Sequence, residues 1–136
     1  MADKVEFELV SPERLLVSRG VDMVVVPGEE GDFGVLPGHA LFLSGVRPGV
    51  IEVYDGDTVS DRIFVAGGFA EVTGDRCTVL AEEAINLAEV DRVEVEARIK
   101  DNEQALSVAG PDEDVASYKD DLGIGRALLE AVDSKQ

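Results

Sequence analysis

The chain has 136 residues, the length of one ordinary domain or of one small domain with a short appendage. Its 45% content of hydrophobic residues argues against a disordered protein, although 29 Asp and Glu against 12 Lys and Arg give a formal net charge of -17. This acidity argues against nucleic acid as a partner and against direct insertion into anionic lipid, because both are bound through Lys and Arg.

The first part of the chain, residues 1–85, has the composition of strands and turns. The residues up to Ala84 hold 11 of the 14 Gly, 4 of the 5 Pro and 6 of the 7 aromatic residues. Apolar and polar residues alternate or form short apolar runs, as they do in half-buried strands. The predicted strands are 5–9, 21–26, 50–54, 62–66, 70–73 and 76–81. Their close spacing, without helices between them, predicts an antiparallel β-sandwich.

Three groups of turn residues separate the later strands. They are Asp55-Gly56-Asp57, Gly67-Gly68 and Thr73-Gly74-Asp75. Gly, Asn and Asp tolerate the positive φ of tight hairpin turns, so each group predicts a hairpin. Between the second and third predicted strands lies a further stretch, residues 31–43, which we expect to be a loop.

The second part, residues 86–136, predicts an antiparallel two-helix hairpin. Both Asn86 with Glu89 and Asp91 with Glu94 have the spacing of a capping box, so the first helix starts at one of them and runs to about Val108. A second helix follows from Asp114. Its apolar positions alternate in steps of three and four and draw one narrow stripe. These positions are Val115, Tyr118, Leu122, Gly125, Leu129 and Val132.

Two glycines weaken the second helix. Gly123 and Gly125 each cost about 1 kcal/mol relative to Ala in a helix interior, so the helix must depend on what it packs against. Two interpretations remain open for Gly125: close approach of the first helix, or a mobile element.

Few residues could support catalysis. The lone Cys77 excludes an internal disulfide, fits a reducing compartment and is expected to be a small buried hydrophobe. A pair of Cys77 with the single His39 stays open but has no local signature. The carboxylates Glu29, Glu30 and Asp32 could serve an enzyme, but neighbouring carboxylates in a turn usually form a solvated rim. No spacing indicates a metal site. We therefore expect no catalytic residues and no metal.

The stretch from Gly31 to Leu43 combines large apolar side chains with turn residues and carboxylates, as protein-binding loops do. Written GDFGVLPGHALFL, it resembles the signature loop of the epsilon subunits of F-type ATP synthases, which are equivalent to the mitochondrial delta subunit. Three further passages agree with the family in order and spacing: VEFELVSPERLL at the start, VAGGFAEV at 65–72 and TVLAEEAI at 78–85.

The resemblance implies a noncatalytic rotor subunit of the central stalk, which couples proton-driven rotation of the membrane c-ring to the gamma subunit and the catalytic head. In this family the β-sandwich binds gamma and rests on the polar loops of the c-ring. The helical hairpin lies against the sandwich or extends towards the alpha and beta subunits. The implied location is peripheral, on the cytoplasmic face of the bacterial inner membrane.

The resemblance also implies which residues form the c-ring and gamma contact. Carried over by position, they lie in the turn from Glu29 to Phe33 and the loop from Pro37 to Phe42. They are Glu29, Glu30, Gly31, Asp32, Phe33, Pro37, Gly38, His39, Leu41 and Phe42. Many members have Pro where this chain has Leu41, so the loop is expected to be less rigid.

The hairpin departs from the regulatory pattern of the family. Members that bind ATP carry Arg three residues after an Asp that corresponds to Asp91, but this chain has Glu94 there, so ATP binding is predicted to be weak or absent. We expect Arg92 and Arg98 to pair with Glu89, Glu94 or Glu96 along the helix surface.

Strong inhibition of ATP hydrolysis in the family uses basic residues of the second helix. Here Lys119 and Arg126 stand among more acidic neighbours, so inhibition is predicted to be weak. The candidate regulatory residues are Asp91, Lys119 and Arg126. The alternative to a rotor subunit is a stand-alone acidic β-sandwich that serves as an adaptor or ligand-binding module.

Overall fold

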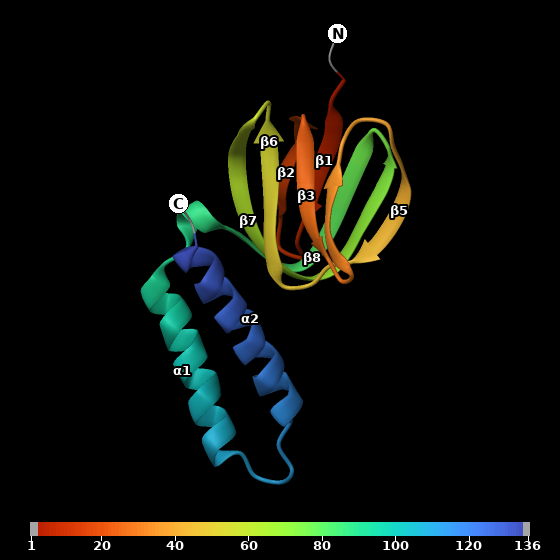
Figure 1. Cartoon of the computed structure of the whole chain (residues 1–136). Helices are drawn as coiled ribbons and strands as arrows, with labels where there is room; N and C mark the ends of the chain where they lie inside the picture. Colours follow the sequence, from red (N-terminus) through yellow and green to blue (C-terminus); the bar gives the residue numbers. More distant parts are fainter. Residues whose placement is uncertain (1–2, 135–136) are drawn as a thin grey trace. The chain divides into compact units, whose positions relative to one another are not determined.

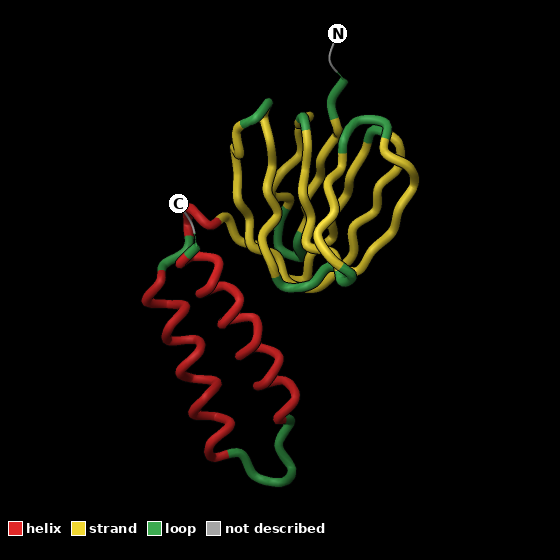
Figure 2. The backbone as a smooth tube through the Cα atoms, in the orientation of Figure 1, coloured by secondary structure: helices red, strands yellow, loops and turns green. Residues whose placement is uncertain are grey.

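The computed structural model describes residues 3–134, which divide into two compact units, one ending at Ala88 and the other beginning at Glu89. Strands fill the first unit, and helices form the second (Figure 2). The strands are β1 (Val5–Val10), β2 (Leu15–Val21), β3 (Met23–Gly28), β4 (Gly31–Val35), β5 (His39–Gly45), β6 (Gly49–Asp55), β7 (Thr58–Gly74) and β8 (Arg76–Asn86). The helices are the short η1 (Leu87–Glu89), α1 (Arg92–Val108) and α2 (Val115–Asp133).

The eight strands form the predicted β-sandwich (Figure 1). Its two layers are joined through β7, which pairs with β6 along its first half and with β5 along its second half. One layer has the order β2-β1-β8-β7-β5, and the other has β7-β6-β3-β4. Apolar side chains that alternate along the strands fill the space between them. The core contains Val5, Phe7, Leu9, Val24, Val26, Ile51, Val53, Ile63, Val65, Val72 and Val79, among others.

One pairing departs from the antiparallel prediction. β1 lies parallel to β8, with Phe7 opposite Cys77 and Leu9 opposite Val79. Every other strand pair is antiparallel within the described residues.

The prediction of two strands separated by a turn at Gly67-Gly68 is wrong. These glycines lie inside the single strand β7, and the β7–β8 ladder keeps one register from Thr73 opposite Arg76 to Ile63 opposite Asn86. Gly68 has a φ of 102°, and a Cβ atom there would collide with the carbonyl oxygen of Leu80. Gly68 is therefore required by close approach of two backbones where β7 passes from one layer to the other, and a Cβ atom at Gly67 would meet the Glu82 side chain.

The expected loop at residues 31–43 is mostly strand, and this too is a correction. β4 and most of β5 occupy the segment, and only residues 36–38 form a turn between them. β2 was also missed. The run 21–26 is interrupted at Asp22, where β2 ends and β3 begins. Tight turns at Gly56 and at Gly74-Asp75 agree with the prediction.

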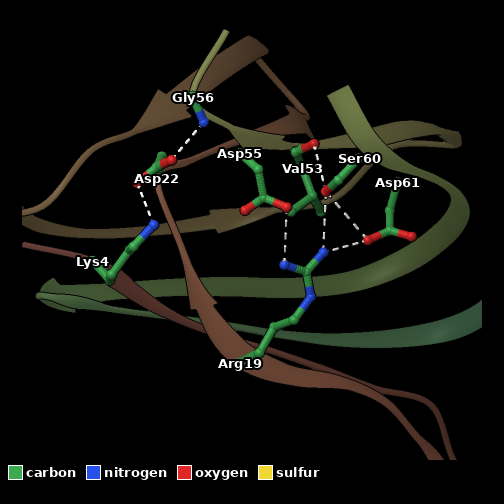
Figure 3. Close-up of polar contacts among 8 residues, drawn as sticks. All are labelled: Lys4, Arg19, Asp22, Val53, Asp55, Gly56, Ser60 and Asp61. Carbon is green, nitrogen blue, oxygen red and sulfur yellow. Dashed lines mark hydrogen bonds and ion pairs between the residues drawn. The ribbon is translucent and has the colours of Figure 1, made fainter. Parts of the chain in front are cut away.

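The long sides of the sandwich are closed by two different sets of side chains. On one side, Phe33 of β4 meets Phe42 of β5 edge to face, with ring centroids 4.9 Å apart. On the other, Arg19 of β2 donates to Asp55, Ser60 and Asp61 of the β6–β7 hairpin (Figure 3). We call the second set, with the adjoining Lys4–Asp22 ion pair, the polar seam. Asp22 also accepts a hydrogen bond from the Gly56 backbone.

The second unit is the predicted antiparallel hairpin. Asp91 is the N-cap of α1 and accepts from the Val93 backbone at 2.9 Å, so the second of the two predicted starts is confirmed. Asn86 instead caps the short η1 by accepting from the Ala88 backbone. Within α2, Leu122 and Gly125 are buried as predicted, but the stripe continues through Leu128 and Ala131 and not through Leu129 and Val132.

Candidate partner-binding surface

The turn between β3 and β4 forms one wall of an open cleft of about 490 Å³ in the sandwich. The Glu29 backbone donates to the Gly45 carbonyl at 2.9 Å, which fixes the turn against the end of β5. The Phe33–Phe42 pair provides the apolar wall. The cleft is lined by Glu29, Glu30, Gly31, Asp32, Phe33, Phe42, Leu43, Ser44 and Gly45. Six of the predicted contact residues therefore gather in one hollow.

The carboxylates of this cleft differ in whether they have a partner within the described residues. Asp32 accepts from Arg47 at 2.6 Å, and Arg47 also donates to the Gly28 carbonyl at 2.5 Å. This pair holds the turn to the connection between β5 and β6. No side-chain hydrogen bond or ion pair within residues 3–134 engages Glu29 or Glu30.

The remaining predicted contact residues lie at the other end of β4. The register of β3 with β4 places Gly28 opposite Gly31 at one end and Val24 opposite Val35 at the other. Four residue-to-residue steps along β4 separate these ends by roughly 13 Å. Pro37 and Gly38 follow the far end, where the Gly38 backbone, with a φ of 81°, donates to Asp75 at 2.9 Å. A single continuous contact loop is therefore not what the fold presents.

His39 and Leu41 begin β5 at this far end. The His39 backbone donates to the Leu36 carbonyl at 3.2 Å, and its ring Nδ1 lies 2.7 Å from the Ala40 carbonyl. Leu41 is 77% exposed. Its side chain is thus available to a partner.

Sequence reasoning missed an apolar patch on the outer face of β5, β7 and β8. Leu43, Phe69 and Leu80 are all more than half exposed and, with Glu71 and Thr78, surround a second hollow of about 360 Å³. We call these three residues the outer apolar patch. The strand pairing continues this apolar surface across β1 to β2, because Leu80 lies opposite Val10 and Val10 lies opposite Leu15. The sequence does carry a signal for this patch. Successive side chains of a strand point to opposite faces, so adjacent apolar residues such as Val79-Leu80 and Phe69-Ala70 place one apolar side chain on the outer face.

The candidate regulatory residues in the hairpin lie apart from one another. Asp91 is occupied as a helix cap. Arg126 pairs with Glu103 across the two helices at 3.2 Å. Lys119 is exposed, and no ion pair involves it within the described part of the chain. The expected pairing of Arg92 with Glu96 is present, and Arg98 forms an ion pair with Asp121 of α2 that was not predicted.

The remaining chemistry is sparse. Cys77 is buried, as expected, and burial raises the pKa of its thiol to about 12, so it carries no thiolate at neutral pH. Residues 3–134 contain no cluster of three or more His, Cys, Asp or Glu side chains placed to hold a metal ion. Their helices include none that is long and apolar enough to cross a membrane.

Comparison with known proteins identifies the family. Residues 4–87 match the family model described as "ATP synthase, Delta/Epsilon chain, beta-sandwich domain". This chain belongs to the ATP synthase epsilon family. It is 56% identical over 131 residues to the ATP synthase epsilon chain of Rhodospirillum rubrum, covering 96% of this chain and 98% of the relative. Identity to the epsilon chain of Paramagnetospirillum magneticum is 54%, with coverage of 97% and 99%.

Solved structures agree on the fold. A chain of the Euglena gracilis mitochondrial ATP synthase matches with a TM-score of 0.79 and 23% identity, covering 96% of this chain and 82% of that one. A chain of the Tetrahymena thermophila mitochondrial ATP synthase matches with a TM-score of 0.63 and 19% identity, covering 96% and 98%. The predicted family and fold are confirmed, and the alternative of a stand-alone acidic adaptor is not supported.

Proposed function

We propose that this chain is a noncatalytic subunit of the ATP synthase central stalk, which transmits proton-driven rotation of the c-ring to gamma and the catalytic head. Its support is family membership over nearly the whole chain, together with structural matches to assemblies described as containing F1, the c-ring or the central stalk. The observation that carries the mechanical role is that one rigid β-sandwich bears two neighbouring surfaces of different chemistry.

The acidic cleft suits the polar loops of the c-ring. Glu29 and Glu30 form no ion pair with another described residue. An Arg or Lys from a partner loop would therefore meet two carboxylates beside the Phe33–Phe42 rings. Guanidinium groups bond carboxylates and also bind over aromatic faces. This contact would hold the chain on the cytoplasmic face of the inner membrane as a peripheral protein.

The outer apolar patch suits gamma. Neighbouring exposed apolar side chains that form one patch often mark a surface that another protein covers. Leu43 lines both hollows, so a partner on the patch and a partner in the cleft would meet along β5. Torque would then pass through the short rigid path from one partner to the other.

Crosslinking and binding in the assembled complex test this assignment. A photo-crosslinker at position 30 or 42 should capture the c-ring, and one at position 69 should capture gamma. Leu80→Asp should weaken copurification with gamma by roughly tenfold or more, because a charge would be buried in the contact. Leu36→Asp is the matched control, since Leu36 and Leu80 are both 55% exposed but only Leu80 lies in the patch.

Two results would overturn the assignment. If Leu36→Asp weakened gamma binding and Leu80→Asp did not, gamma would bind at the far end of β4 and not on the patch. If the full chain failed to copurify with gamma at all, the central-stalk role itself would be wrong.

The hairpin is proposed to contribute little inhibition of ATP hydrolysis. The unit has more acidic than basic groups, and Arg126, one of the few cations of α2, is paired with Glu103. Removal of residues 87–136 should change the ATPase rate of the reconstituted complex by less than about twofold, whereas a large activation would contradict weak inhibition. Glu94 in the first turn of α1 should likewise leave ATP binding weak or absent in a nucleotide titration of the full chain.

A further inference from the structure

Arg98 and Asn102 of α1 converge on one carboxylate of α2. Arg98 donates to both oxygens of Asp121, from Nη2 to Oδ1 at 2.6 Å and from Nε to Oδ2 at 3.2 Å. Asn102 donates to Asp121 Oδ2 at 2.6 Å and to the Arg98 carbonyl at 3.0 Å. We call these three residues the inter-helix cluster. Its geometry is bidentate and is reinforced by a third donor.

This cluster differs from the other contacts between the helices. Two further ion pairs join them within the described residues, Arg92 with Asp133 and Arg126 with Glu103, and their four side chains are 47% to 60% exposed. In the cluster, the Arg98 side chain is 25% exposed and the Asp121 side chain 42% exposed, so the difference lies in Arg98 and in the bidentate geometry. Exposed pairs stabilise little, while shielded and bidentate pairs hold a fixed geometry. Hydrogen bonding from Arg98 holds the pKa of Asp121 below its ordinary value, so this carboxylate stays ionised at neutral pH.

The apolar contact beside the cluster is narrow. On α2 the buried residues are Leu122, Gly125, Leu128 and Ala131, and on α1 the buried residue is Val95. Gly125 sits so close to α1 that a Cβ atom would lie 3.1 Å from Ile99 Cγ1. Apolar burial of this extent leaves much of the pairing of the helices to polar contacts.

We propose that Asp121 is a latch that keeps α2 paired with α1, so that the hairpin meets any other protein as a closed two-helix unit and not as separate helices. The latch goes beyond the proposed coupling role and does not depend on which partners the sandwich binds. Gly123 and Gly125 lower the stability of α2 just after Asp121 in the sequence. The contact of Asp121 with α1 would offset this loss. Opening of the hairpin would require exchange of the Asp121 contacts for contacts with another protein.

Hydrogen exchange of the full chain tests the latch. In Asp121→Asn, backbone amides of α1 and α2 should exchange roughly tenfold faster than in the wild type, because the bidentate ion pair is lost while the side-chain volume is kept. Asp120→Asn is the matched control: it removes the same charge from the adjacent position, where the side chain has no hydrogen bond or ion pair to another described residue. Its hairpin amides should stay within about twofold of the wild type.

A charge reversal separates the contact from a general effect on helix stability. Arg98→Glu alone should open the hairpin, and combination with Asp121→Arg should restore much of the protection, because the pair is re-formed with the opposite polarity. Equal exchange in Asp121→Asn and Asp120→Asn would overturn the latch. So would accelerated exchange throughout the sandwich, since the effect would then not be local to the hairpin. Neither outcome would bear on gamma or c-ring binding, which is read by copurification.

Discussion

The two units of this chain are held together by different forces. The sandwich encloses a continuous core of buried Val, Leu, Ile and Phe side chains between two layers, and the ion pairs of its described residues join partly exposed side chains outside this core. The hairpin buries a narrow stripe and joins its helices through Arg98, Arg126 and Arg92. Apolar burial depends weakly on salt and pH, whereas exposed and half-exposed ion pairs depend on both. The sandwich is thus suited to transmit force, and the hairpin to change state.

Truncation of the sandwich core should produce the largest effect. Phe7 is fully buried between the layers, so Phe7→Ala removes its apolar contacts and leaves a cavity. We expect the free energy of unfolding of the sandwich to fall by about 3–5 kcal/mol. Denaturant titration followed by NMR signals of sandwich amides measures it. Phe69→Ala is the control, because that side chain is 61% exposed and its loss should cost less than about 1 kcal/mol. Similar losses in both variants would contradict a core that dominates stability.

The close approach inside β7 should produce the next largest effect. Gly68→Ala places a methyl group against the Leu80 carbonyl and also strains a backbone with positive φ, so the sandwich should lose at least about 2 kcal/mol. Gly74→Ala has the strain without the collision, since nothing lies within 4 Å of its added Cβ. That variant should lose about 1–2 kcal/mol. If thermal unfolding gave the same loss for both, close backbone approach would not be the reason for glycine at position 68.

Position 68 also illustrates where sequence reasoning reached its limit. Local alternation correctly predicted a β-sandwich and most of its strands, because period-two burial is written in neighbouring residues. A pair of glycines has two structural explanations, a turn or a close approach, and only the partner strand distinguishes them. The parallel pairing of β1 with β8 was beyond reach for the same reason, since Phe7 and Cys77 are 70 positions apart.

The candidate site was predicted as one segment, and the structure places its residues at two ends of β4. Residues 29–42 are contiguous in sequence, but β4 carries Pro37 and His39 to the opposite end from Glu29. In the hairpin, the expected pairing of Arg92 along one helix was right because i,i+4 spacing is local. Asp121, with which Arg98 also pairs, lies 23 residues away on α2, and the packing register that brings the two residues together is not visible in the sequence.

Replacement of the two glycines of α2 by Ala should change the stability of the hairpin by smaller amounts and in different directions. Gly123→Ala should stabilise the hairpin by about 1 kcal/mol, because Ala favours the helix and the added methyl group meets no atom within 4 Å. Gly125→Ala gains the same propensity but forces Ile99 to shift, so its net effect should be near zero or destabilising. Helix melting followed by circular dichroism at 222 nm compares them. Equal stabilisation by both would show that the helices do not depend on close contact at Gly125.

Acidification should destabilise the two units to different extents, and this is the smallest of the predicted effects. Hydrogen bonds from Arg98 lower the pKa of Asp121, and hydrogen bonds from Lys4 and Gly56 lower the pKa of Asp22 in the polar seam. A carboxyl whose folded pKa is depressed stabilises the fold above its unfolded pKa of about 3.9, and this stability is lost as the pH falls through the folded pKa. Both units therefore lose an ion pair below about pH 4.

Only the sandwich has a core that can tolerate this loss. On acidification from about pH 5 to pH 3, NMR amide signals of α1 and α2 should lose their folded dispersion before those of β1 to β8. In Asp121→Asn the hairpin signals should already be weakened at neutral pH and should change less over the same range, because the titrating group is gone. Simultaneous loss of both sets of signals would mean that the two units are stabilised in the same way, and the contrast between an apolar sandwich and an ion-paired hairpin would fail.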